Sequence, residues 1–168
     1  ARTASCGLAA GAPLRSRFTL QTRLDYYELS HLEKIIARNC GLLRISVDSD
    51  GINEIARRCR GTPRVANRLL RRTRDFAQVE GQGVVDLAIV DLTLDRLGID
   101  TEGLDSMDRK VLETIAFKFD GGPVGIDSLA TAIGEEGDTI EDVYEPFLIM
   151  CGFIQRTRAG RILTSSGR

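Results

Sequence analysis

Apolar residues recur every three or four positions through most of the chain, and this spacing predicts a mainly helical protein. In the first half it predicts a unit of four helices. These are expected from Ser30 to near Gly41, from about Asp50 to Gly61, from Pro63 onward, and from about Val85 to Leu97. Ser30 lies two positions before Leu32, the first residue of the apolar repeat, and is expected to cap that helix.

A second unit is expected after residues 98–105, where the apolar period stops and glycines and aspartates accumulate. A helix introduced by Ser106, a short one at Ile126–Ile133 and a third opened near Asp138 precede a hairpin predicted over residues 153–164. Pro146 is expected to kink the third helix. Three helices followed by a hairpin is the order of a winged helix.

The basic residues of this second unit lie on the hairpin, while its third helix is acidic. In winged helices the third helix usually enters the major groove, but Glu141, Asp142 and Glu145 would repel phosphate there. The hairpin is therefore the better candidate for contacting DNA. Its candidate DNA-binding residues are Arg156, Arg158 and Arg161.

The start of the third helix in the first unit has a distinct chemistry. Thr62 can cap this helix and Pro63 can occupy its first position, where a missing N–H costs nothing. Arg64 then places a permanently charged planar fork beside the positive end of the helix, which suits a phosphate oxygen. An ordinary capped helix with a solvated arginine fits the same pattern.

Charge is strongly segregated along the chain, although the net charge is only −1. Residues 57–74 hold eight arginines and no acid, residues 80–145 hold 17 acids against four bases, and residues 152–168 hold four arginines and no acid. This pattern suggests two separate contacts with anions; solvated basic faces are the plainer interpretation.

Composition narrows the class of protein further. The 168 residues are 42% hydrophobic, and they contain no long apolar run and no signal-peptide pattern, which favours the cytoplasm. The cysteines Cys6, Cys40, Cys59 and Cys151 have no metal-binding spacing, and His31 is the one histidine. We therefore expect reduced structural thiols and no metal site formed by this chain.

Several short motifs follow one another in a characteristic order: residues 13–18 (PLRSRF), 24–27 (LDYY), 61–64 (GTPR), 71–76 (RRTRDF), 108–110 (DRK), 121–125 (GGPVG) and 139–147 (TIEDVYEPF). No single motif is decisive, but their order and spacing together are not expected by chance. Over about nine tenths of the chain, this order resembles the RuvB family of AAA+ motors.

The resemblance implies specific roles for several residues. Arg17 matches the arginine finger that reaches ATP on the neighbouring subunit, with Arg15 as the alternative. Arg64 matches the sensor-2 arginine that touches the γ-phosphate, and Tyr27 and Pro63 match positions beside the adenine. These roles are coherent, because phosphoryl transfer is catalysed mainly by positioning and charge neutralisation. For Tyr27 a core aromatic is the alternative.

The sequence also departs from the family pattern. It contains no Gly-x-x-x-x-Gly-Lys-Ser/Thr segment, so this chain alone is not expected to bind ATP or ADP with magnesium stably, or to hydrolyse ATP. No sensor-1 residue is identified near Cys6, and Thr19 replaces a usual glycine. The hairpin keeps its basic charge, but one arginine is moved to position 158.

The resemblance implies the C-terminal part of a motor, with residues 1–24 as a remnant of the α/β ATPase domain, 25–98 as the AAA+ helical lid and 99–168 as the winged helix. In the complete protein it implies ATP-driven migration of four-way DNA junctions by a homo-hexamer with a RuvA-like partner, in recombination and repair. Two other hypotheses are a free-standing winged-helix regulator that uses no nucleotide, and an interaction module whose acidic third helix binds a basic partner.

Overall fold

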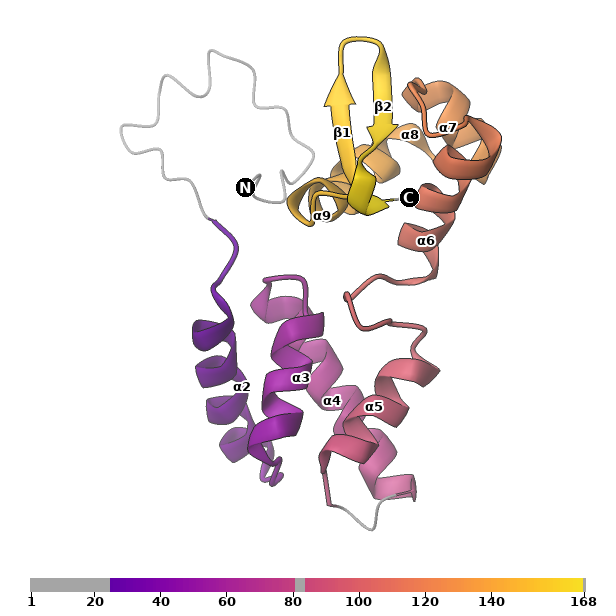
Figure 1. Cartoon of the computed structure of the whole chain (residues 1–168). Helices are drawn as coiled ribbons and strands as arrows, with labels where there is room; N and C mark the ends of the chain where they lie inside the picture. The colour runs from indigo at the N-terminus through magenta and orange to yellow at the C-terminus, as the bar shows by residue number, and fades with distance from the viewer. Residues whose placement is uncertain (1–24, 81–83, 168) are drawn as a thin grey trace. The chain divides into compact units, whose positions relative to one another are not determined.

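A computed structural model describes residues 25–80 and 84–167, which fold mainly into helices (Figure 1). They divide into two compact units, one spanning Tyr26–Ser106 and the other beginning at Met107. The predicted fold class, a helical unit followed by a winged-helix unit, is confirmed for these residues. Residues 1–24, with the candidate finger Arg17 and its alternative Arg15, lie outside the described part.

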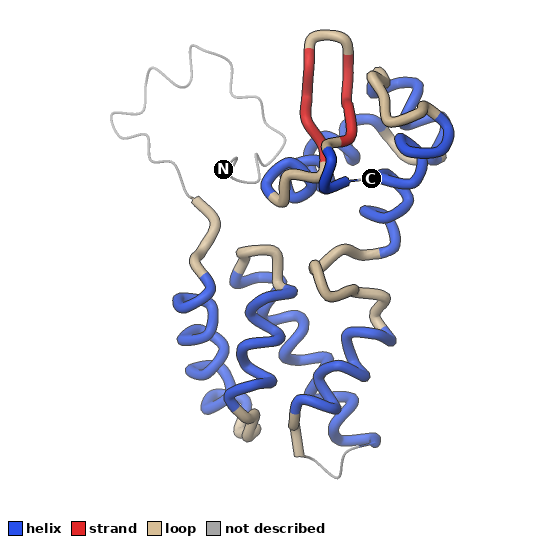
Figure 2. Tube along the Cα trace, in the orientation of Figure 1, coloured by secondary structure: helices blue, strands red, loops and turns tan. Residues whose placement is uncertain are grey.

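The first unit, called the lid unit below, contains the four predicted helices. They are α2 (Leu29–Leu43), α3 (Ser49–Arg58), α4 (Pro63–Glu80) and α5 (Leu87–Arg96). Helix α2 packs against α3 and α4, and α5 packs against the same two helices. Figure 2 shows how short loops join the first three of these helices.

Aspartates cap two of these helices. The Asp48 carboxylate accepts a hydrogen bond from the Gly51 N–H at 2.7 Å, and Asp86 accepts one from the Ile89 N–H at 3.0 Å. The cap predicted at Ser30 was wrong. Helix α2 begins at Leu29, and the extended backbone of Glu28 occupies the cap position, so Ser30 already lies within the helix.

The apolar faces of the four helices form one core. Its fully buried members include Leu32, Ile36, Ile55, Leu69, Leu70, Val90 and Leu94. Burying each such side chain contributes about 1.5–3 kcal/mol relative to exposure. The buried thiols of Cys40 and Cys59 are also part of this core.

The segment predicted as a linker is attached to the lid unit. Ile99 is buried in the lid core, and Arg60 forms an ion pair with Asp105 at 2.7 Å. Asp100 accepts hydrogen bonds from the N–H groups of Glu102 and Leu104, which closes a tight turn. This loop is therefore an ordered extension of the lid unit rather than a loose spacer.

The second unit has the predicted winged-helix order. Its first helix is α6 (Ser106–Glu113), continued by a π-helical segment (Thr114–Lys118), and its second is α7 (Ile126–Ile133). The third helix consists of α8 (Gly137–Thr139), a π-helical segment (Ile140–Tyr144) and α9 (Glu145–Met150). Ile115, Leu129, Ile140 and Leu148 of these helices are fully buried, and α7 packs against both π-helical segments.

Pro146, where a kink was predicted, lies where the third helix changes from π-helical to α-helical geometry. Pro146 lies in the first turn of α9, directly after the π-helical segment. Proline has no N–H to donate to the preceding turn, so a regular α-helix cannot run unbroken through this position.

The predicted hairpin consists of β1 (Ile154–Thr157) and β2 (Gly160–Leu163), paired with Ile154 opposite Leu163 and Arg156 opposite Arg161. We call residues 154–163 the wing. Strand β2 also pairs with Val124, through a bond from the Arg161 N–H to the Val124 oxygen at 2.8 Å and a return bond at 2.9 Å. Gly160 permits this approach, because a Cβ there would lie 2.4 Å from the Val124 oxygen.

Candidate nucleotide-sensing and DNA-binding sites

The predicted start of α4 is confirmed. The helix begins at Pro63, and the Thr62 hydroxyl accepts a long hydrogen bond of 3.4 Å from the Val65 N–H. The Thr62 carbonyl accepts the first helical bond, from the Ala66 N–H at 3.1 Å. The first turn of α4 therefore has the geometry that the sequence indicated.

Tyr27 lies beside this helix start, although 35 residues separate it from Thr62 in the numbering. Its N–H donates to the Gly61 carbonyl at 2.9 Å, so its backbone runs against the turn that leads into Pro63. Tyr27 is 49% exposed. The core-aromatic interpretation of Tyr27 is therefore wrong, and the ring is accessible for stacking.

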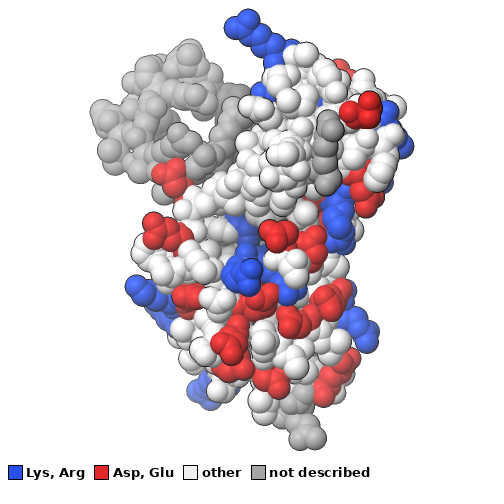
Figure 3. All heavy atoms as spheres, viewed as in Figure 1, with Lys and Arg blue, Asp and Glu red and all other residues white. Residues whose placement is uncertain are grey.

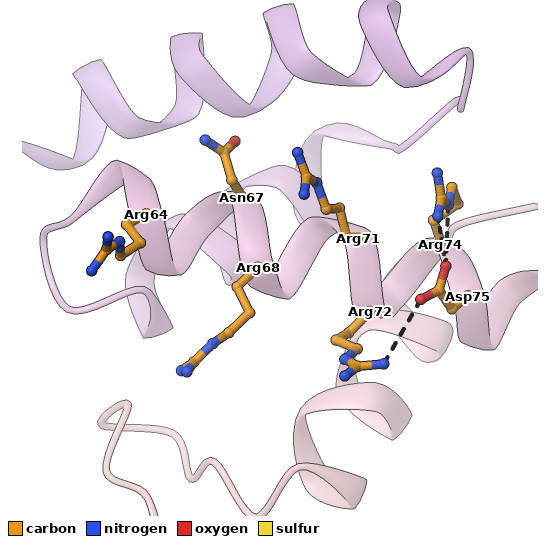
Figure 4. A pocket seen from close by; sticks show the side chains of 7 residues that line it. All are labelled: Arg64, Asn67, Arg68, Arg71, Arg72, Arg74 and Asp75. Carbon is orange, nitrogen blue, oxygen red and sulfur yellow. Dashed lines mark hydrogen bonds and ion pairs between the residues drawn. The ribbon is translucent and has the colours of Figure 1, made fainter.

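Arg64 is exposed on the first turn of α4, and it forms no ion pair within the described part of the chain. It lies at one end of an open groove of about 520 Å³ along this helix. Figure 4 shows Arg64 at the start of α4, with further side chains following it along the helix. The groove is lined by Arg64, Asn67, Arg68, Arg71, Arg72, Arg74 and Asp75.

Other arginines of the basic run serve the fold. Arg58 is buried, bonded through Nε to Glu54 at 2.6 Å and through Nη2 to Asp91 at 3.1 Å. Arg60 is held by Asp105, and Arg74 pairs with its neighbour Asp75 at 2.8 Å. The run therefore combines arginines that join elements of the lid unit with exposed ones on α4.

The start of α4 can bind an anion. The N-terminal turn of a helix carries partial positive charge and N–H groups without intrahelical partners. The unpaired guanidinium of Arg64 adds a full charge with bidentate geometry. The structure thus brings together Tyr27, Pro63 and Arg64, the three residues expected to contact a nucleotide.

The second candidate site is the wing, where three arginines have different surroundings. Arg158 lies in the turn between the strands, is exposed, and forms no ion pair within residues 25–80 and 84–167. Figure 3 shows a basic side chain projecting at the top of the view, the side on which Figure 1 draws the turn of the hairpin. Arg156 points from β1 with its side chain 41% exposed.

Arg161 is buried, with 8% of its surface exposed, and it contacts acids of the third helix. Its Nε donates to Glu145 at 2.6 Å and its Nη2 donates to Glu141. Burial alone would lower the pKa of Arg161, but hydrogen bonds and charges from Glu145 and Glu141 raise it above the usual value. The DNA contact expected for Arg161 therefore needs revision, because its guanidinium is already engaged inside the unit.

The third helix lacks the side chains that most often hydrogen-bond to DNA bases. Residues 137–150 contain no lysine, arginine, asparagine or glutamine, the side chains that most often hydrogen-bond to base edges in the major groove. Asp142 and the apolar Val143, Ile149 and Met150 are exposed on it. This chemistry agrees with the expectation that the hairpin, rather than the third helix, approaches DNA.

Sequence reasoning treated Glu145 only as part of an acidic helix face and missed its partners. The available signal was its position three residues before the buried Leu148, on the apolar side of the helix. An acid at such a position requires a buried cation, and Arg161 is that cation.

Other site types find no support within the described residues. Among residues 25–80 and 84–167, no group of three or more His, Cys, Asp or Glu side chains is arranged to hold a metal ion. None of the described helices has the length and apolar composition needed to cross a bilayer.

These features define a class: a helical lid of the AAA+ type, with an arginine on the first turn of α4, followed by a winged helix. Family models agree with this, since the RuvB AAA lid domain matches residues 27–100 and the RuvB C-terminal winged helix domain matches residues 101–168. The chain belongs to the RuvB family.

Individual relatives support the same assignment. The Holliday junction branch migration complex subunit RuvB of Chlorobaculum tepidum is 56% identical over 91% of this chain and 44% of its own length. That of Myxococcus xanthus is 57% identical over 91% of this chain and 45% of its own length. The chain thus spans about half the length of the curated relatives it matches, or slightly less.

A solved structure extends the similarity to three dimensions. The Thermotoga maritima RuvB Holliday junction branch migration motor matches with a TM-score of 0.89 and 44% identity, over 93% of this chain and 52% of the other. The fold of the described residues is therefore that of the C-terminal half of a RuvB motor.

Proposed function

We propose that this chain is the C-terminal part of an ATP-driven DNA motor that moves four-way junctions. Residues 1–24 would end the ATPase domain, residues 25–98 form the lid and residues 99–168 form the DNA-binding winged helix, with the loop at 99–105 held on the lid. The proposal includes a homo-hexamer, a RuvA-like junction-binding partner, ATP or ADP with magnesium, and a place in the cytoplasm. It is supported by relatives whose names describe branch migration.

The observation that carries the proposal is the joint geometry of Tyr27 and Arg64. The bond between the Tyr27 N–H and the Gly61 carbonyl sets an exposed aromatic ring beside a helix start that carries an unpaired arginine. A base-stacking surface next to a phosphate-binding group is what an adenine nucleotide requires. A DNA-binding regulator without a nucleotide has no need for this arrangement.

Each residue then has a defined task. The Tyr27 ring and Pro63 provide flat apolar contact for a base, and Arg64 directs its guanidinium at a terminal phosphate. A bound nucleotide supplies the phosphoryl group whose transfer drives the motor, with magnesium neutralising part of its charge. Arg17, from the neighbouring subunit, is proposed to reach the same phosphate. Arg158 and, more weakly, Arg156 are proposed to contact DNA phosphates.

The test uses a complete protein made by joining this chain to the N-terminal part of the Chlorobaculum tepidum relative. We expect Arg64→Ala to lower ATP turnover about 10²–10³-fold, as loss of one aligned charge-stabilising donor does. Arg57→Ala is the matched control, because Arg57 is an exposed arginine of the same unit that lies outside the groove. Turnover and binding of a fluorescent ATP analogue would be measured for both.

Equal turnover in the two variants would reject the nucleotide role of Arg64. It would favour one of the alternatives, a regulator or an interaction module that uses no nucleotide.

A further inference from the structure

A buried carboxylate joins the third helix to both strands of the wing. Glu145 is 1% exposed, and its oxygens accept hydrogen bonds from Arg161 Nε at 2.6 Å and Arg156 Nε at 3.1 Å. A second nitrogen of Arg156 also contacts it. A carboxylate at this depth is stable only when cations and donors compensate its lost hydration, and the two strands supply both.

The wing is also attached to the loop before α7, at Val124. The backbone of Arg161 exchanges two hydrogen bonds with Val124, while its side chain reaches Glu145 and Glu141. The same residue therefore fixes β2 to the loop before α7 by its backbone and to the third helix by its guanidinium. Arg156, opposite Arg161 in the hairpin, is drawn to the same acid.

These contacts compete with a direct DNA role for Arg161. To reach a phosphate, its guanidinium would have to leave Glu145 and expose an uncompensated carboxylate next to the incoming negative charge. Arg158 carries no such constraint, because it lies in the turn beyond both ion-paired arginines. Arg161 therefore attaches the wing to the third helix, and the turn that contains Arg158 remains accessible to an anion.

We propose that Glu145 is a positioning residue of the DNA-contacting wing: it anchors Arg161 and Arg156 so that the turn with Arg158 is presented to the phosphates. This inference rests on the proposed DNA contact of the wing. It adds a role for an acid in DNA binding, exerted through the wing and without contact to DNA.

The test compares a single variant with a compensated pair in the whole chain. Arg161→Met leaves Glu145 without its main cation, whereas Glu145→Leu with Arg161→Met replaces the ion pair by apolar side chains of similar volume. Two measurements are made: amide hydrogen exchange of residues 154–163 without DNA, and the salt dependence of affinity for two unrelated duplexes. Arg158→Met, in the same hairpin, is the matched control.

If Glu145 positions the wing, Arg161→Met speeds amide exchange in the wing at least about tenfold and weakens DNA binding, and the pair restores both. Arg158→Met leaves exchange unchanged and lowers the slope of log affinity against log salt by about 0.9, the value for one phosphate contact. If Arg161 itself contacts a phosphate, Arg161→Met lowers the slope of log affinity against log salt, and the compensated pair does not restore it. That result would reject the inference.

The two proposals fail in different ways. Absence of DNA binding by the unmodified chain, or an unchanged slope in Arg158→Met, would reject the DNA contact of the wing. If amide exchange in the wing of Arg161→Met is as slow as in the unmodified chain, the anchoring role of Glu145 is rejected, whether or not the chain binds DNA.

Discussion

The two basic runs of this chain look alike in sequence but differ in what their arginines can do. On α4, Arg64, Arg68 and Arg71 are exposed and form no ion pair within the described residues. In the wing, Arg156 and Arg161 are bound to Glu141 and Glu145, and Arg158 is the arginine that is exposed and forms no ion pair within the described residues. Availability for an anion therefore depends on acids elsewhere in the fold, more than on the number of arginines.

The origin of the compensating acids explains the difference. Arg161 meets Glu145 and Glu141, which lie 16 and 20 positions earlier, because the hairpin folds back onto the third helix. On α4 the nearest acid, Asp75, pairs with Arg74 and more distantly with Arg72, at 4.0 Å. The first turns of α4 thus keep their charge for a ligand.

The largest expected effect is on ATP hydrolysis and concerns Arg17, which lies outside both basic runs. It would extend the comparison to an arginine supplied by another subunit. In the complete protein described above, Arg17→Ala should lower ATP hydrolysis about 10³–10⁵-fold while nucleotide binding persists. Mixing with unmodified subunits should restore part of the activity, because a normal neighbour supplies the missing charge. Uniform inactivity in mixtures would indicate a structural role for Arg17, and Arg15→Ala tests the alternative residue.

The free energy of unfolding should respond differently to substitutions at the two basic runs. Glu145→Ala leaves two arginines without their buried partner and should cost about 3–5 kcal/mol in the free energy of unfolding of the winged-helix unit. Arg64→Ala on α4 should change the stability of the lid unit by less than about 0.5 kcal/mol, as exposed sites do. Urea unfolding followed by hydrogen exchange in each unit measures both.

The matched control for Glu145 is Glu141→Ala, because Glu141 contacts the same arginines with its side chain 36% exposed. Solvent screens this pair, so its loss should cost no more than about 1 kcal/mol. Similar costs for the two acids would show that burial is not what distinguishes the wing from α4.

A smaller effect is expected in the affinity of the chain for DNA duplexes of different sequence. A wing that presents Arg158 to phosphates, beside a third helix without lysine, arginine, asparagine or glutamine, should bind unrelated duplexes with affinities within about threefold of one another. Fluorescence anisotropy at several salt concentrations measures this. A strong preference for one duplex would instead favour a regulator that reads sequence.

The smallest effect distinguishes the cores of the two units. Burial raises the pKa of Cys40 and Cys59 above 9.0, the usual value of the thiol. Below that value both the folded and unfolded states keep the proton, so the stability contribution is complete. As pH rises through it, the unfolded chain loses protons first, and the lid unit should lose stability.

Thermal unfolding from pH 8 to 10 would check this expectation, because the interval brackets the usual thiol pKa. A Cys59→Ala variant should show a weaker pH dependence than the unmodified chain. An equal dependence in both would mean that Cys59 does not carry the effect.

Local sequence patterns predict the helices, the winged-helix order and the start of α4. These features depend on local signals: apolar periodicity, the Thr62–Pro63 pair, and turn residues around Gly160. Such signals act between neighbours in the chain, so no tertiary knowledge is needed to interpret them. Ser30 shows their limit, because residues two positions apart can compete for one cap position, and the cap is at Glu28.

Which charged and aromatic side chains are accessible to a ligand depends on contacts between residues that are distant in the sequence. Tyr27 is exposed beside Pro63 because its backbone pairs with Gly61, and Arg161 is buried because its strand folds against Glu145. Both outcomes depend on contacts between residues far apart in sequence, and a residue's charge or ring gives no sign of them. Electrostatic energy and solvation vary with distance and burial, which exist only once the chain has folded.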